Sequence, residues 1–117
     1  MAEAKKVEKL ISRLSDSTYW WESEEKATVR RRAAADTLGK LGDTSAVPHL
    51  IKALSDSVGY VRRAAAEALG KLEDTSAVPH LIKALSDYDD NVRNYAANAL
   101  GMLVDASAVP GLIKALS

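Results

Sequence analysis

The sequence contains no cysteine, carries no net charge and has no long hydrophobic run. Without cysteine the chain forms no disulfide, and the usual zinc frameworks are excluded as well. Basic and acidic residues number 16 each, so no long-range field attracts nucleic acid or an anionic membrane. No apolar segment is long enough for a signal peptide or a membrane span. We therefore expect a cytoplasmic protein without membrane attachment, in which 117 residues form one domain with a modest core.

An internal repeat of 31 residues is the main feature of the sequence. The segment 43–56, Asp-Thr-Ser-Ala-Val-Pro-His-Leu-Ile-Lys-Ala-Leu-Ser-Asp, recurs letter for letter at 74–87, and a worn copy occupies 105–117. The segment 61–70 recurs with three substitutions at 92–101, at the same offset. Self-similarity at such a period predicts a stacked array of short structural units.

Each period contains two amphipathic helices, because its apolar residues follow three-and-four spacing, as at Val78, Leu81, Ile82 and Leu85. Proline is tolerated in a first helical turn, so the prolines mark the starts of the first helices: Pro48, Pro79 and Pro110. The pattern predicts seven helices and no strands, at about 3–15, 24–41, 45–55, 58–72, 76–86, 90–103 and 107–116. The expected fold is all-α, an α-solenoid of stacked antiparallel helix pairs.

Glycine occurs inside each expected second helix, at Gly39, Gly70 and Gly101. Within a helix, glycine costs about 1 kcal/mol relative to alanine. We interpret these glycines as points of close helix approach. Asp56 and Asp87 precede second helices and are expected to cap their free N–H groups.

The offsets divide the single domain into an N-terminal capping helix (1–17), an insertion (18–29), repeat units (30–42, 43–73 and 74–104) and an unpaired last helix (105–117). The insertion holds Trp20 and Trp21, which either stack on a ligand or anchor the insertion. Ser23 is expected to cap a helix that part of the insertion lengthens. The last helix lacks a partner for its apolar stripe at Val109, Leu112, Ile113 and Leu116, which indicates association with a second copy or a longer array.

The paired pattern Ala-Val-Pro-x-Leu-Ile-x-Ala-Leu-x-Asp and Val-Arg-x-x-Ala-Ala-x-Ala-Leu-Gly resembles the HEAT-like repeats of phycobilisome chromophore lyases and of designed repeat scaffolds. The resemblance covers residues 30–117 closely and residues 7–17 as a half repeat. It implies a structural ladder of aspartate and arginine, Asp56 with Arg62 and Asp87 with Arg93. Because of the insertion, the sequence does not decide whether the first such pair, Asp16 with Arg31, forms.

The resemblance also implies that non-core positions of the second helices line a concave binding face. These positions are Tyr60, Arg63, Ala64, Glu67 and Lys71 in one unit, and Asn91, Asn94, Tyr95, Asn98 and Met102 in the next. Tyrosine and arginine are typical interface anchors. Tyr95 stands where the neighbouring copies have Ala33 and Ala64, which favours binding. The alternative is a solvated helix face on which the tyrosine shields its neighbours.

No metal or cofactor is expected. His49 and His80 stand on neighbouring units about 10 Å apart, too far to share one ion. In HEAT-repeat hydroxylases that hold iron, the ligands are His-Glu pairs in the second helices; this chain has Arg63-Ala64 and Asn94-Tyr95 there.

The sequence is best explained as a non-catalytic protein-binding or scaffold module whose partner is another protein, with possible homo-oligomers through the last helix. A nucleic-acid-binding protein is the runner-up. Lysines recur on the first helices and arginines cluster on the second, although acidic residues are interleaved with them: Lys52, Lys83, Lys114, Arg30–Arg32, Asp36 and Glu67. A chromophore-lyase-like accessory protein is the third possibility, suggested by the resemblance alone.

Overall fold

The computed structural model describes the backbone of residues 2–15 and 23–116, and the side chains of residues 4–14 and 23–104. These residues form α-helices and short 3-10 turns without any strand: α1 (Ala2–Ser15), α2 (Glu24–Leu41), η1 (Thr44–Ala46), α3 (Val47–Ala53), α4 (Gly59–Leu72), η2 (Thr75–Ala77), α5 (Val78–Ala84) and α6 (Asp90–Leu116). No helix in this part of the chain is both long and apolar enough to span a membrane.

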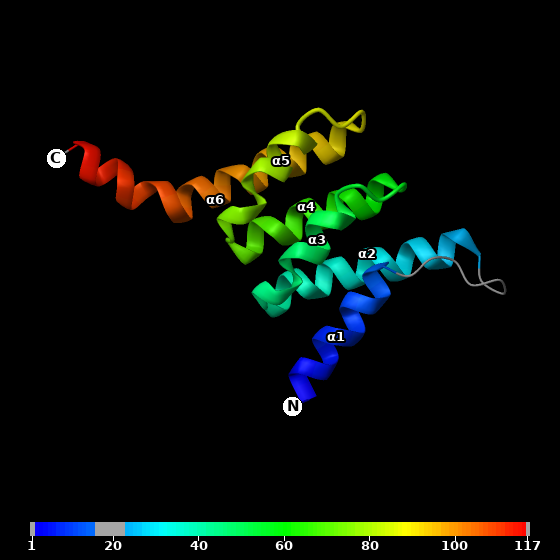
Figure 1. Ribbon diagram of the computed structural model, residues 1–117. Coiled ribbons are helices and arrows are strands. Elements are labelled where there is room, and N and C mark those ends of the chain that lie inside the picture. The colour runs from blue at the N-terminus through cyan, green and yellow to red at the C-terminus, as the bar shows by residue number, and fades with distance from the viewer. Residues whose placement is uncertain (1, 16–22, 117) are drawn as a thin grey trace.

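The helices stack as pairs along one direction, with overall dimensions of 61 × 40 × 16 Å. Figure 1 shows α2, α4 and α6 side by side, with α3 packed on α4 and α5 on α6, while α1 packs on α2 and α3. The predicted α-solenoid of helix pairs is confirmed.

The core repeats with the same period as the sequence. Leu50 and Leu81 are fully buried at one repeated position, and Val61 and Val92 are fully buried at another. Alanines fill much of the surface between the second helices, so that α2, α4 and α6 approach closely. At the N-terminal end, α1 buries Val7, Leu10 and Leu14 and exposes its charged side chains.

Two of the three glycines are points of close helix approach, as predicted. A Cβ atom at Gly39 would stand 2.9 Å from Cα of Ala68, and one at Gly70 would stand 3.0 Å from Cα of Ala99. At Gly101 a Cβ atom would meet nothing within 4 Å. The interpretation is wrong for this third glycine, because in the described part of the chain no further helix packs on α6 there.

The predicted helix starts are confirmed for Pro48 and Pro79, which lie in the first turns of α3 and α5. Ser23 caps α2, its side chain accepting a hydrogen bond from N–H of Lys26 at 3.2 Å. α2 begins at Glu24, four positions before the point equivalent to the start of α4. Part of the insertion therefore lengthens this helix, as expected.

The predicted capping by Asp56 and Asp87 is wrong. Their carboxylates accept hydrogen bonds from N–H of Val58 and Asp89, both at 2.9 Å, and so tighten the turns that precede the helices. In α6 the capping side chain is that of Asp89, which accepts from N–H of Asn91 at 2.8 Å. A short turn separates each aspartate from the helix, so its carboxylate bonds an N–H group of the turn rather than one of the helix.

The expected break between helices at 90–103 and 107–116 is absent, because α6 is one helix and Pro110 lies inside it. The described residues therefore form six α-helices rather than the expected seven. α2 and α4 each end at a residue in the left-handed conformation, Gly42 with φ 69° and Glu73 with φ 54°. The equivalent residue of α6 is Val104, whose β-branched side chain disfavours that conformation. The helix therefore continues where the other two end. The side chains of the apolar stripe expected at 109–116 lie outside the described residues.

A candidate binding groove beside an aspartate-arginine ladder

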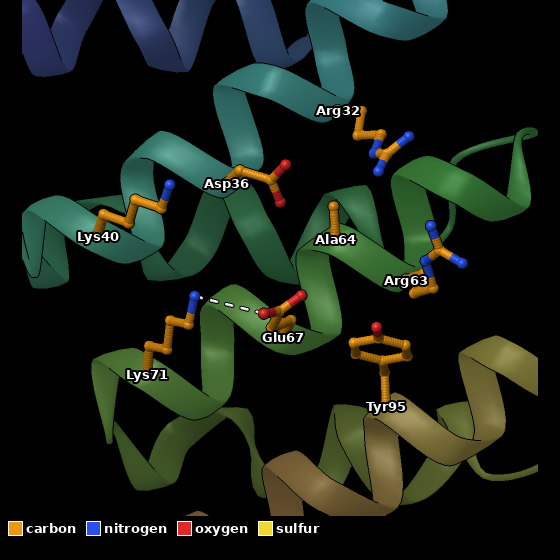
Figure 2. A pocket seen from close by; sticks show the side chains of 8 residues that line it. All are labelled: Arg32, Asp36, Lys40, Arg63, Ala64, Glu67, Lys71 and Tyr95. Atoms are coloured by element: carbon orange, nitrogen blue, oxygen red, sulfur yellow. Dashed lines mark ion pairs between the residues drawn. The ribbon is translucent and has the colours of Figure 1, made fainter.

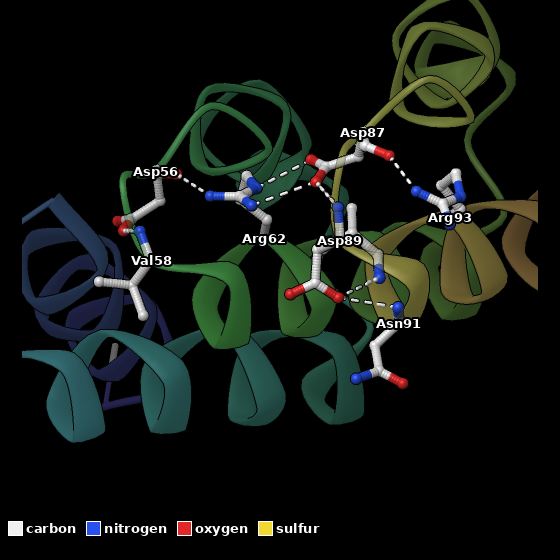
Figure 3. A network of polar contacts seen from close by, with 8 residues as sticks. Asp56, Val58, Arg62, Asp87, Asp89, Asn91 and Arg93 are labelled. Atoms are coloured by element: carbon white, nitrogen blue, oxygen red, sulfur yellow. Dashed lines mark hydrogen bonds and ion pairs between the residues drawn. The ribbon is translucent and has the colours of Figure 1, made fainter.

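A ladder of buried charges joins neighbouring repeats and holds the second helices in place (Figure 3). Arg62 donates from Nε to Oδ2 of Asp87 at 2.8 Å and from Nη2 to Oδ1 at 3.1 Å. Its Nη1 donates to the main-chain oxygen of Asp56 at 2.9 Å. Only 5% of Arg62 is exposed, so these bonds satisfy a guanidinium that solvent barely reaches.

The expected pairing within each repeat is wrong for the carboxylates of Asp56 and Asp87, because each of them accepts from an arginine of the preceding repeat. Arg31 accordingly bonds Asp56, from Nε to Oδ2 at 2.9 Å, and Arg62 bonds Asp87. Asp16, the expected partner of Arg31, lies outside the described residues. Arg93 donates to the main-chain oxygen of Asp87 at 2.7 Å and pairs with Asp90 on its own helix. An arginine side chain is long enough to reach across the turn, and doing so neutralises a carboxylate at the junction of two repeats.

The ladder also sets the protonation of Asp87. Burial alone would raise the pKa of this carboxyl group, but the hydrogen bonds from Arg62 and from N–H of Asp89, with the charges of Arg62 and Arg93, outweigh it and lower the pKa. The same hydrogen bond to Asp87 raises the pKa of Arg62. Both groups therefore stay charged at neutral pH.

A pocket of about 200 Å³ lies across α2, α4 and α6, and all of its lining residues belong to these three second helices. We call it the central groove. It is lined by Arg32, Asp36, Lys40, Arg63, Ala64, Glu67, Lys71 and Tyr95. Figure 2 shows these side chains converging from three helices, with Tyr95 rising from α6 toward α4.

The 31-residue offset arranges the groove in three rows of equivalent positions. From α2 through α4 to α6 the rows are Arg32, Arg63 and Asn94; Asp36, Glu67 and Asn98; and Lys40, Lys71 and Met102. An acidic row thus runs between two basic rows on α2 and α4, and all three rows become uncharged on α6. Lys71 pairs with Glu67 at 3.3 Å between Nζ and Oε1.

Arginine and tyrosine alternate at one end of the groove. Cζ of Arg63 lies 5.2 Å from the ring centre of Tyr60 and 5.5 Å from that of Tyr95. Cζ of Arg32 lies 5.8 Å from the ring of Tyr60. Arg63 also lines an adjacent pocket together with Tyr60 and Asn91, so this one residue borders both the central groove and the adjacent pocket.

The structure brings most of the predicted binding residues to this surface, although it does not test what they bind. Arg63, Glu67, Lys71 and Tyr95 line the central groove, and Tyr60 and Asn91 line the adjacent pocket. The remaining three, Asn94, Asn98 and Met102, are exposed on α6. Tyr95 is half-buried and packs against the core while it also lines the groove.

The predicted binding face omitted three groove residues on α2, Arg32, Asp36 and Lys40, of which the first two were considered only for nucleic-acid binding. The repeat offset could have found them, because they are equivalent to Arg63, Glu67 and Lys71. Trp20 and Trp21 lie outside the described residues. His49 and His80 are exposed, and the described residues contain no cluster of three side chains that could hold a metal ion.

Comparison with known proteins identifies the repeat. A family model of HEAT repeats matches residues 7–87 and again residues 47–117. No curated protein sequence matches the chain. A similar solved chain comes from the complex of CpcE and CpcF of phycocyanin lyase from Nostoc, with 26% identity and a TM-score of 0.54 over 87% of this chain and 54% of that one. Another is human deoxyhypusine hydroxylase in complex with glycerol, with 24% identity and a TM-score of 0.60 over 83% of this chain and 43% of that one. The chain thus spans about half the length of these solved chains, and the second likeness shows the fold alone.

Proposed function

Because this chain belongs to the HEAT-repeat family, we propose that it is a non-catalytic protein-binding module whose partner protein occupies the central groove. The observation that carries the proposal is the Tyr60–Arg63–Tyr95 cluster, in which two aromatic rings flank one arginine at the mouth of the groove. Tyrosine and arginine are the residue types that most often dominate binding energy at protein interfaces. A cytoplasmic location is part of the proposal and agrees with the absence of cysteine.

Two further facts support a protein partner. One similar solved chain is itself part of a complex of two proteins, CpcE and CpcF. In addition, core positions such as Val61 and Val92 keep the same residue from α4 to α6, whereas the equivalent groove positions change from charged to uncharged, as from Arg63 to Asn94. Uniform packing positions beside variable groove positions are what a repeat scaffold needs to recognise one partner.

Replacing Arg63 or Tyr60 with alanine should weaken partner binding about tenfold or more, because truncated anchor residues typically cost 1–2 kcal/mol or above. Tyr60 is 58% exposed, so its loss should hardly change stability, whereas Tyr95 also packs on the core. The measurement is a calorimetric titration with a partner captured from the source organism and then purified. Lys83, exposed on α5, supplies the control variant Lys83→Ala. Weaker binding by the control, with the groove variants unchanged, would move the site to the other face.

We also propose that the exposed face of α6 pairs with a second copy of the chain. Gly101 occupies the position at which Gly39 and Gly70 receive a neighbouring helix, yet its surroundings are open. Val104, one turn further on, is 50% exposed. This face therefore continues the surface through which the repeats stack on one another. Sedimentation equilibrium should show dimers at high micromolar concentration, and Val104→Lys should shift the equilibrium to monomer. A helical monomer at all concentrations would refute the pairing.

A further inference from the structure

Two arginines that are adjacent in α4, Arg62 and Arg63, differ in burial and in bonding partners. Arg62 is buried and bonded to the carboxylate of Asp87. Arg63 is half-exposed, and within the described residues its only specific contacts are with the faces of two tyrosine rings. A cation–π contact uses the positive charge of the guanidinium rather than its N–H groups, which remain available to donate. Arg32, exposed on α2, likewise makes a ring contact and no ion pair with any described residue.

The two ring contacts also favour particular positions of the Arg63 side chain before any ligand arrives. An arginine that already contacts two rings loses less rotamer freedom when it binds than one that moves freely in solvent. A guanidinium with its edge exposed matches a carboxylate, which accepts two parallel N–H bonds. The Arg63 site is therefore built for an anionic group.

The arrangement of charged rows indicates whether the anionic group belongs to a nucleic acid or to a peptide. The acidic row of Asp36 and Glu67 lies next to the row of Arg32 and Arg63. A nucleic acid repeats its negative charge at every phosphate and would be repelled by the acidic row. A peptide can place one acidic side chain against the arginines and neutral or basic side chains elsewhere.

From these observations we propose that the central groove recognises a peptide segment through an aspartate or glutamate side chain, whose carboxylate binds Arg63 between Tyr60 and Tyr95, with Arg32 as a second donor. This rests on the proposed function and adds the chemical class of the partner. On α6 the rows end in Asn94, Asn98 and Met102, so the rest of the segment meets an uncharged surface there.

The test is selection of a phage-displayed library of random dodecapeptides on the intact chain, followed by fluorescence anisotropy with the synthetic form of the best peptide. Selected peptides should share an aspartate or glutamate. Changing that residue to asparagine or glutamine should weaken binding about tenfold or more, as expected for loss of a charged hydrogen-bond partner. Arg63→Lys keeps the charge but removes the bidentate geometry, so it should weaken binding about fivefold or more. Lys83→Ala, on the opposite face, should bind as the unmodified chain does.

The outcomes separate this inference from the proposed function. Peptides without a shared acidic residue, whose binding is nevertheless lost with Tyr60→Ala, would overturn the acidic segment and leave the groove as a protein-binding site. Binding unaffected by both Tyr60→Ala and Arg63→Ala would overturn both proposals. Failure to select any peptide, or tighter binding of a thymidine dodecanucleotide than of the best peptide, would overturn the inference as well. Unfolding curves for each variant show whether its fold is intact.

Discussion

Replacing Arg62 with alanine is expected to lower the free energy of unfolding by about 3–5 kcal/mol, the usual cost of breaking a buried ion pair by removing one partner. The side chains of Arg62 and Asp87 are only 7% and 10% exposed, so the remaining carboxylate would be left poorly solvated. The variant also loses the bond to the main-chain oxygen of Asp56, which joins the same arginine to the preceding turn. Urea unfolding followed by far-ultraviolet circular dichroism measures the loss.

Arg63→Ala is the matched control, since it removes the same side chain one residue away. Among the described residues Arg63 makes specific contacts only with tyrosine rings, so the control should lose about 1 kcal/mol or less. Equal losses in the two variants would show that the ladder contributes little beyond general packing.

Acid should reduce the difference between the Arg62→Ala variant and the unmodified chain. The pKa of Asp87 is lowered in the folded protein, so its stabilising effect is complete above the unfolded value of about 3.9 and is lost as the pH falls through the folded pKa. The two unfolding curves should therefore differ most above about pH 5 and converge in stronger acid. A difference that stays constant throughout the acid range would mean that Asp87 is not the group stabilised by Arg62.

The repeat could be predicted from sequence because each unit has the same packing problem. A residue such as Leu50 or Leu81 is buried by neighbours that recur with it, so hydrophobic spacing locates helices and core together. The end of α6 was mispredicted because similarity to the earlier copies outweighed one local change. Val104 replaces a residue that must adopt a left-handed conformation, and backbone sterics then favour a continuous helix.

The groove was only partly predictable for a different reason. Sequence patterns show which positions face away from the core, but not which side chains meet across helices. The contact between Arg63 and Tyr95 joins α4 to α6, and that between Arg32 and Tyr60 joins α2 to α4. The ladder was misassigned in the same way, since the partner of Arg62 is decided by the reach of its side chain across a repeat boundary. The identities of these residues were readable from the sequence, whereas their pairing required coordinates.

Gly39→Ala and Gly101→Ala should have opposite effects on stability, although each adds one methyl group to a second helix. At Gly39 the new Cβ would lie 2.9 Å from Cα and 3.0 Å from Cβ of Ala68, so α2 and α4 must separate, and such overpacking costs about 1–3 kcal/mol. At Gly101 the methyl group meets open space in the single chain, so the higher helix propensity of alanine should stabilise the monomer by about 0.5–1 kcal/mol.

Thermal unfolding of both variants beside the unmodified chain tests this difference in sign, and a stabilising Gly39→Ala would mean that α2 and α4 yield without cost. The separation of these two helices also sets how far Arg32 lies from Tyr60 across the groove. Gly39→Ala should therefore weaken ligand binding as well, because the arginine supplied by α2 moves away from the tyrosine supplied by α4. The separation between stacked second helices therefore also sets the width of the proposed binding surface.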